Sequence, residues 1–119
     1  MRATLSKAER LSSTSAISKL MSDGRWGNAG AIRYCTLSPN GMTFNRIMVS
    51  VPKKLFKRAV MRNLYKRRLR EAYRTQKHLR PCEPGTDILL IYNSKEAYGF
   101  QAISTLVAEI LRRTADEQR

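Results

Sequence analysis

The sequence has few residues of the kinds that bind metals or cross-link chains: of 119 residues, two are cysteine and one is histidine. It also lacks a long hydrophobic run. The longest apolar stretch, residues 88–92, is far shorter than the roughly 20 residues that span a membrane. The first residues show no apolar core of a secretory signal. We therefore expect a cytoplasmic protein that makes no membrane contact.

The two cysteines, Cys35 and Cys82, are not expected to pair. A protein without an export signal stays in a reducing compartment, where such cysteines usually remain thiols. His78 and Cys82 are four residues apart, but Pro81 lies between them, and a structural zinc ion needs further ligands. We predict neither a disulfide nor a protein-bound metal.

Acidic residues are scarce as well, because 9 Asp and Glu oppose 23 Lys and Arg and leave a formal net charge of +14. Hydrophobic residues make up 42% of the chain, which suffices for a compact core and excludes a wholly disordered basic tail. The length suits one domain, here residues 1–119, and excludes a multidomain enzyme. The polyanions that match such a folded basic domain are nucleic acid and an anionic membrane face, and nucleic acid is favoured.

The first half of the chain predicts a helix followed by a hairpin. Apolar residues at helical spacing predict a helix over residues 11–21, with Gly24 as its stop signal. Residues 31–37 and 43–51 have the composition of strands. The intervening Ser38-Pro39-Asn40-Gly41 run favours a tight reversal, so we expect these two strands to pair directly.

The second half predicts a helix, a strand and a final helix. Residues 59–79 are helical in composition, and the Pro- and Gly-containing residues 81–85 end that helix. Residues 87–92 form a nearly continuous apolar strand, of the kind that is paired centrally. From Phe100 to Leu111 apolar residues recur at spacings of three and four. The order of elements predicts a two-layer α+β sandwich.

The functional signal is a concentration of cations in the middle of the chain. Residues 53–80 hold 12 of the 23 basic residues and one acidic residue, Glu71. At about 100° per residue, one helical face collects Arg62, Asn63, Lys66, Arg67, Arg70, Arg74 and Lys77. The opposite face collects Met61, Tyr65, Leu69 and Ala72. Solvated helix faces normally mix acids and bases at i,i+4, so this face predicts phosphate binding.

Asn63 is the one uncharged member of that basic face. Its amide suits a hydrogen bond to a base edge, a ribose or a neighbouring backbone turn. An ordinary surface asparagine fits the pattern equally well, and the sequence leaves these alternatives open.

These residues resemble the signature of the bacterial ribonuclease P protein family. The resemblance lies in Val49-Ser50-Val51-Pro52-Lys53-Lys54 and in Arg58-Ala59-Val60-Met61-Arg62-Asn63-Leu64-Tyr65-Lys66-Arg67-Arg68-Leu69-Arg70-Glu71-Ala72-Tyr73. The predicted elements follow the family order over nearly the whole chain. The resemblance implies an α/β sandwich of the ribosomal S5 domain 2-like type, with order α-β-β-(β)-α-β-α and a left-handed βαβ crossover around the basic helix.

The resemblance also implies a function. Proteins of this family assist a large catalytic RNA, the ribonuclease P RNA, which removes the 5′ leader from precursor tRNA. The protein subunit holds the leader and strengthens metal binding at the RNA active site. The implied partners are that RNA and precursor tRNA, and the implied cofactor is Mg²⁺ held at the RNA active site. The sequence identifies no protein partner.

Carried over by position, the RNA contacts are Arg62, Asn63, Lys66, Arg67 and Arg70, with Lys53 and Lys54 at the preceding bend. Arg58 and Arg74 complete the predicted RNA-binding residues. The leader is expected in a cleft between the first helix and the sheet, lined by Ile17, Met21, Cys35 and Phe44. Ile17 and Met21 stand where the family often has phenylalanines, and Cys35 stands where a strand aromatic is common. Leader binding is therefore expected to rest more on shape and charge, and for Phe44 a core role is favoured over a leader contact.

The chain shows no catalytic set of its own in its sequence. Its acids are scattered and His78 is alone, whereas acid–base or two-metal chemistry needs clustered groups. We expect the catalytic centre in the RNA partner. The alternative is a ribosomal or other structural RNA-binding protein of similar fold. A DNA-binding regulator would need a helix-turn-helix pair, which no residues before Ala59 provide, and a membrane-surface protein would need the apolar helix face that the core occupies.

Overall fold

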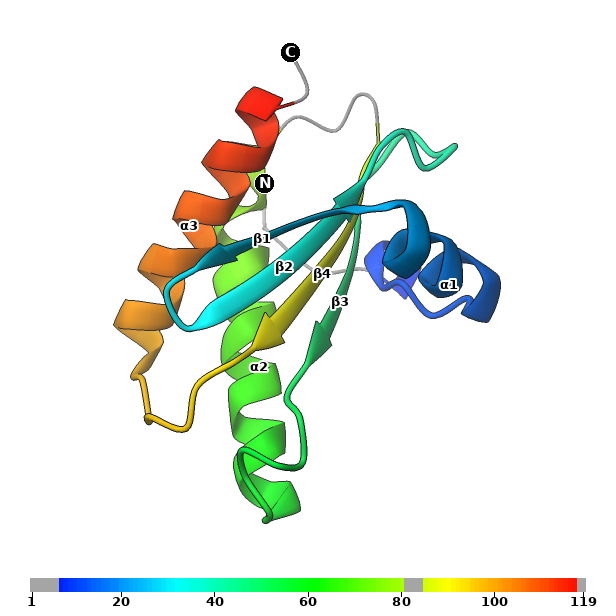
Figure 1. Cartoon of the computed structure of the whole chain (residues 1–119). Helices are drawn as coiled ribbons and strands as arrows, with labels where there is room; N and C mark the ends of the chain where they lie inside the picture. The colour runs from blue at the N-terminus through cyan, green and yellow to red at the C-terminus, as the bar shows by residue number, and fades with distance from the viewer. Residues whose placement is uncertain (1–6, 81–84, 118–119) are drawn as a thin grey trace.

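The computed structural model describes residues 7–80 and 85–117 (Figure 1). The predicted helix-ending segment before Gly85 and its Cys82 lie outside the described residues. The elements are η1 (Lys7–Glu9), α1 (Thr14–Asp23), β1 (Arg25–Ala29), β2 (Ile32–Leu37), β3 (Arg46–Ser50), α2 (Ala59–Gln76), η2 (Lys77–Leu79), β4 (Asp87–Tyr92) and α3 (Phe100–Glu117).

One four-stranded sheet organises the chain, in the order β1-β2-β4-β3. β2 is antiparallel to both β1 and β4, whereas β3 is parallel to β4. Figure 1 shows α2 and α3 side by side behind the sheet and α1 on its other side. The predicted α+β sandwich is confirmed, and the strand at residues 87–92 is central, as expected.

The predicted hairpin between residues 31–37 and 43–51 is wrong, because β4 lies between β2 and β3. The apolar β4 is buried along nearly its whole length, because it has a neighbouring strand along each edge and a hydrophobic cluster against each face. The loop that contains Asn40 therefore passes over the start of β4 and does not join two directly paired strands. The Asn40 side-chain amide donates to Asp87 Oδ1 at 3.0 Å, and its backbone N–H donates to the Gly85 carbonyl at 2.9 Å.

The hairpin of this fold is formed by β1 and β2, and it turns at Gly30, whose φ of 55° favours glycine. The order implied by the resemblance allows a third strand before the basic helix, but residues 25–29 were not predicted to be a strand. The sequence of β1, Arg-Trp-Gly-Asn-Ala, contains glycine and asparagine, which are rare in strands, and no β-branched residue. β1 belongs to the sheet because it pairs with β2, and this pairing cannot be predicted from the local sequence of β1.

The main hydrophobic core lies between the sheet and the helices α2 and α3. Its fully buried side chains include Tyr34 of β2, Leu69 of α2 and Val107 of α3. A second, smaller cluster lies on the opposite face of the sheet, where Leu20 of α1 packs over Cys35 of β2. Tyr34 and Cys35 thus point to opposite faces, as strand alternation predicts.

The helix α1 is fixed to the sheet at its C-terminal end. The Gly24 N–H donates to the Leu20 carbonyl at 2.8 Å and ends the helix, which confirms the predicted stop. A Cβ atom at residue 24 would collide with that carbonyl and with Cys35 Sγ. Glycine is therefore required here by the close approach of α1 to β2.

Candidate nucleic-acid interface

The basic face of α2 points away from the core because the opposite, apolar face of the helix packs into it. Tyr65, Leu69 and Ala72 are buried against the sheet and α3, and Met61 is half-buried against the same core. This confirms the predicted apolar face. Hydrophobic burial of one side of α2 thus fixes which way the cations point.

The central part of the basic face is open to solvent. Asn63, Arg67 and Arg70 are exposed, and Lys66 is half-buried. Within residues 7–80 and 85–117, no ion pair joins Lys66, Arg67 or Arg70 to an acidic residue. We call Asn63, Lys66, Arg67 and Arg70 the open basic segment. Unneutralised cations this close together form a surface that attracts phosphate.

The two ends of the basic face are held by contacts within the chain. Arg62 Nη1 donates to the carbonyls of Phe56 and Lys57, both at 2.8 Å. Lys77 Nζ forms an ion pair with Glu9 Oε2 at 3.0 Å.

Arg74 is likewise engaged, because its Nε donates to Glu71 Oε2 at 3.0 Å. That hydrogen bond lowers the pKa of the Glu71 carboxyl and raises the pKa of the Arg74 guanidinium. The structure thus separates the predicted basic face into open residues and residues that brace the fold.

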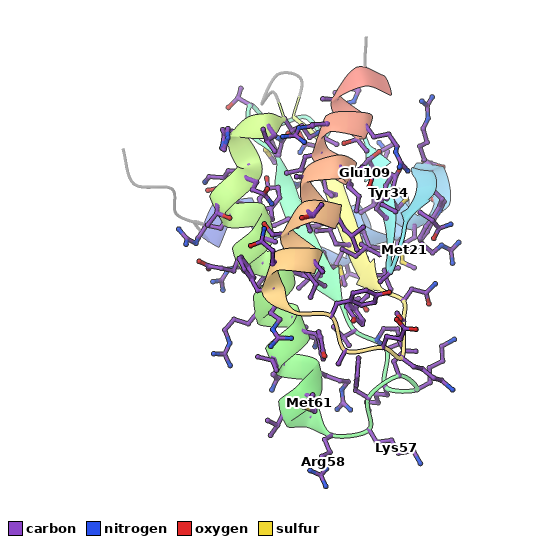
Figure 2. All side chains as sticks on the ribbon, turned by 90° about the vertical axis from the view of Figure 1, so that its left-hand side faces the viewer. Met21, Tyr34, Lys57, Arg58, Met61 and Glu109 are labelled. Atoms are coloured by element: carbon purple, nitrogen blue, oxygen red, sulfur yellow. The ribbon has the colours of Figure 1, made fainter. Side chains whose placement is uncertain are left out.

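The segment before α2 carries further exposed cations. Lys53, Lys54, Lys57 and Arg58 are all exposed. Figure 2 shows Lys57 and Arg58 at the foot of α2, next to Met61. The segment is anchored by Phe56, whose ring stacks on Tyr65 with centroids 4.7 Å apart and an interplanar angle of 14°. Aromatic stacking therefore sets where these cations lie relative to the open basic segment.

A hollow of about 280 Å³ lies beside Arg70, at the outer edge of β3. Its lining is formed by Arg10, Leu11, Ser12, Ile47, Met48, Val49 and Arg70. The N-terminal segment runs along this edge, because the Leu11 N–H donates to the Ile47 carbonyl at 2.8 Å. Its lining includes Arg70 from the basic face of α2 and Met48, which packs against the hydrophobic cluster on the α1 side of the sheet. The sequence predicted Arg70 as an RNA contact but gave no signal for Arg10 beside it.

The predicted leader-cleft residues are only partly brought together. Ile17 and Cys35 belong to the same hydrophobic cluster, and Met21 lies beside them on α1 with 51% of its surface exposed. Phe44 is half-buried in the loop before β3, and it belongs to neither hydrophobic cluster that the described residues form, so these residues do not support the core role favoured for it.

The expectation that Cys35 lines an open cleft is corrected by its burial. Cys35 is fully covered by α1, and its thiol donates to the Leu20 carbonyl at 3.3 Å. Burial raises the pKa of this thiol to about 11. Cys35 therefore anchors α1 on the sheet and presents no surface to a ligand.

Residues 7–80 and 85–117 contain neither a cluster of metal-binding side chains nor a helix suited to span a membrane. No three His, Cys, Asp or Glu side chains come together there in a way that would hold a metal ion. No helix of that part of the chain has the length and hydrophobicity of a transmembrane helix.

Comparison with known proteins relates this chain to one family. The family model described as Ribonuclease P matches residues 5–115. The chain is 42% identical over 77 residues to the ribonuclease P protein component of Porphyromonas gingivalis, covering 63% of this chain and 56% of the relative. It is 45% identical over 65 residues to that of Petrotoga mobilis, covering 55% and 52%. The chain thus spans about half the length of the curated relatives it matches.

Solved structures of this family share the fold. The ribonuclease P protein of Thermotoga maritima superposes with a TM-score of 0.76 at 26% identity, covering 88% of this chain and 96% of that one. The Staphylococcus aureus protein superposes with a TM-score of 0.76 at 24% identity, covering 92% and 96%. The second likeness bears on the fold alone.

Proposed function

The chain belongs to the ribonuclease P protein family, and from that premise we propose that it is the protein subunit of ribonuclease P. In this role it assists a catalytic RNA in the endonucleolytic removal of the 5′ leader from precursor tRNA. The observation that carries the proposal is the open basic segment on α2, whose cations have no acidic partner within the described chain.

The open basic segment has the dimensions of a phosphate-binding surface. Residues 63–70 span roughly 12 Å at 1.5 Å per residue, so the segment reaches a few successive phosphates of a folded RNA. Arg67 and Arg70 present planar guanidiniums that suit bidentate phosphate contacts. Lys53 and Lys54 extend the positive surface beyond the foot of α2. Together these residues dock the catalytic RNA.

The precursor tRNA leader is assigned to the side of the sheet that carries α1. Met21 and Ile17 offer an apolar rim there, and the hollow between Arg10 and Arg70 connects that side to the open basic segment. A single RNA strand can therefore pass from the docked catalytic RNA to the α1 side without leaving positive potential.

The chemistry is assigned to the RNA partner. Mg²⁺ at the RNA active site would supply an activated water and stabilise the leaving oxygen. The residues of this chain bind phosphates, lower the repulsion between RNA segments, and orient the leader strand. We further propose that residues 1–119 act as one RNA-binding domain in the cytoplasm, where precursor tRNA is processed.

A reconstitution assay tests this function. The protein is added to a bacterial ribonuclease P RNA and precursor tRNA, and leader removal is followed over a magnesium titration. We expect no cleavage by the protein alone and a lower magnesium requirement when it joins the RNA. Arg67→Ala/Arg70→Ala should lose that effect, and Arg112→Ala, a change at an exposed arginine of α3, should keep it. Unchanged leader removal at low magnesium on adding the wild-type protein would refute the proposal.

A further inference from the structure

One row of side chains on the α1 side of the sheet is not covered by α1. Strand pairing places Asn28 opposite Arg33, Arg33 opposite Ile91, and Ile91 opposite Ser50. Directly paired residues share a face of the sheet, so these four form one row across all four strands. Asn28 and Arg33 are exposed, and Ile91 and Ser50 are half-buried.

The neighbouring row shows where the cover ends. There Trp26 pairs with Cys35, Cys35 with Leu89, and Leu89 with Met48. α1 covers the middle of this row, since Cys35 is 0% and Leu89 3% exposed. Trp26 and Met48, at its two ends, are only half-buried. An aromatic ring thus stands at the border between the covered and the open part of the sheet face.

Arg33 and Trp26 form a layered pair at that border. The Arg33 guanidinium carbon lies 4.4 Å from the centroid of the Trp26 ring, which is the distance of a cation–π contact. The contact holds the long Arg33 side chain in place, while the residue remains exposed to solvent. Held in this way, the guanidinium offers a flat charged surface above an aromatic ring.

We propose that Trp26 and Arg33 form a stacking platform for an unpaired base of single-stranded RNA. Unpaired bases stack on aromatic rings and on arginine planes. The open row contains a cation and no carboxylate, so no side chain of this row repels the phosphates that flank such a base. Resting on the function proposed above, the strand bound here is the leader of precursor tRNA, and the platform replaces the aromatic side chains that Ile17, Met21 and Cys35 do not provide.

The sequence provides a direct probe, because Trp26 is the single tryptophan of the chain. The purified protein is titrated with a single-stranded oligoribonucleotide while tryptophan fluorescence is recorded, and with an abasic strand of equal length and charge. Binding of each labelled strand is measured in parallel by fluorescence anisotropy. We expect saturable quenching by the base-containing strand, and binding of the abasic strand without that quenching. Equal quenching by both strands, or binding of the base-containing strand without quenching, would overturn the platform.

Variants separate stacking from charge. Trp26→Ala and Arg33→Lys should each weaken binding of the labelled base-containing strand about tenfold, because one removes the ring and the other keeps the charge but removes the guanidinium plane. Trp26→Phe should retain most of the affinity. Phe100→Ala, at an aromatic residue on α3 that is 40% exposed, should bind like the wild type. Wild-type affinity of both folded Arg33→Lys and Trp26→Ala would overturn the proposal.

The outcome is distinct from that of the reconstitution assay. If the wild-type protein lowers the magnesium requirement of the catalytic RNA but shows no base-dependent quenching, the platform is wrong and the proposed function stands. If quenching occurs but the catalytic RNA is not assisted, the platform stands as a single-strand site and the assignment of its strand as a tRNA leader falls.

Discussion

At the scale of single residues, Arg62 and Arg70 lie on the same broad face of α2 in a helical-wheel projection but have different surroundings in the structure. Arg62 is half-buried and bonds two carbonyls of the preceding segment, whereas Arg70 is exposed beside a hollow. Spacing alone predicted that both residues lie on one face. It does not report which guanidinium is taken up by backbone carbonyls, because that depends on how residues 52–58 fold back on α2.

This difference predicts that one alanine substitution lowers stability and the other weakens RNA binding. Arg62→Ala should lower the free energy of unfolding by about 1–2 kcal/mol, because two carbonyls lose their charged donor. Arg70→Ala should change it by less than about 0.5 kcal/mol and weaken RNA binding. Urea denaturation and RNA titration of both variants measure this. Equal stability of the two variants would show that the Arg62 contacts do not brace the segment.

The buried thiol of Cys35 gives a prediction on pH. Its pKa of about 11 lies above the ordinary value of 9.0, so at pH 8 it holds about 100-fold less thiolate than an ordinary cysteine. In a Cys82→Ser variant, alkylation of the folded protein should be at least that much slower than in urea. The rate should rise about tenfold per pH unit up to pH 11. Fast alkylation at pH 8 would mean that α1 does not cover Cys35.

At the scale of elements, the sequence predicted those whose local pattern matches their final surroundings. α2 and α3 show helical spacing of apolar residues, and β4 shows the continuous apolar run of an interior strand. β1 and the order of the strands could not be predicted in this way. The local sequence around Trp26 and Gly27 does not indicate a strand. The insertion of β4 between β2 and β3 depends on pairing between segments that are far apart in the sequence.

The seating of α1 on the sheet can be tested at Gly24. Gly24→Ala adds a methyl group where the Leu20 carbonyl and Cys35 Sγ leave no room, so it should cost about 1–3 kcal/mol. Gly99→Ala is the matched control, since a Cβ there meets no atom within 4 Å. Thermal unfolding of both variants gives the comparison. If Gly24→Ala unfolds at the wild-type temperature, α1 does not approach β2 this closely.

At the scale of the whole molecule, the formal net charge is +14, and the amphipathic helix α2 gathers many of the basic residues on one face. The core fixes the apolar side of α2, and the contacts of Arg62, Arg74 and Lys77 leave the open basic segment as the part free to meet a polyanion. The sequence predicted which residues of α2 share this face, because helical periodicity is local, but it did not predict which of their side chains are engaged within the chain. It did not predict the platform of Trp26 and Arg33, because that pair meets only across β1 and β2.

The central claim is that the open basic segment docks ribonuclease P RNA. It is tested most directly by the salt dependence of that binding for the wild type and for Lys66→Ala/Arg67→Ala/Arg70→Ala. Each phosphate contact contributes about 0.7–0.9 to the slope of log K against log salt, so the triple variant should have a slope smaller by about 2–3. Lys95→Ala/Arg112→Ala, at exposed cations elsewhere, should keep the wild-type slope. An unchanged slope in the triple variant would contradict the account.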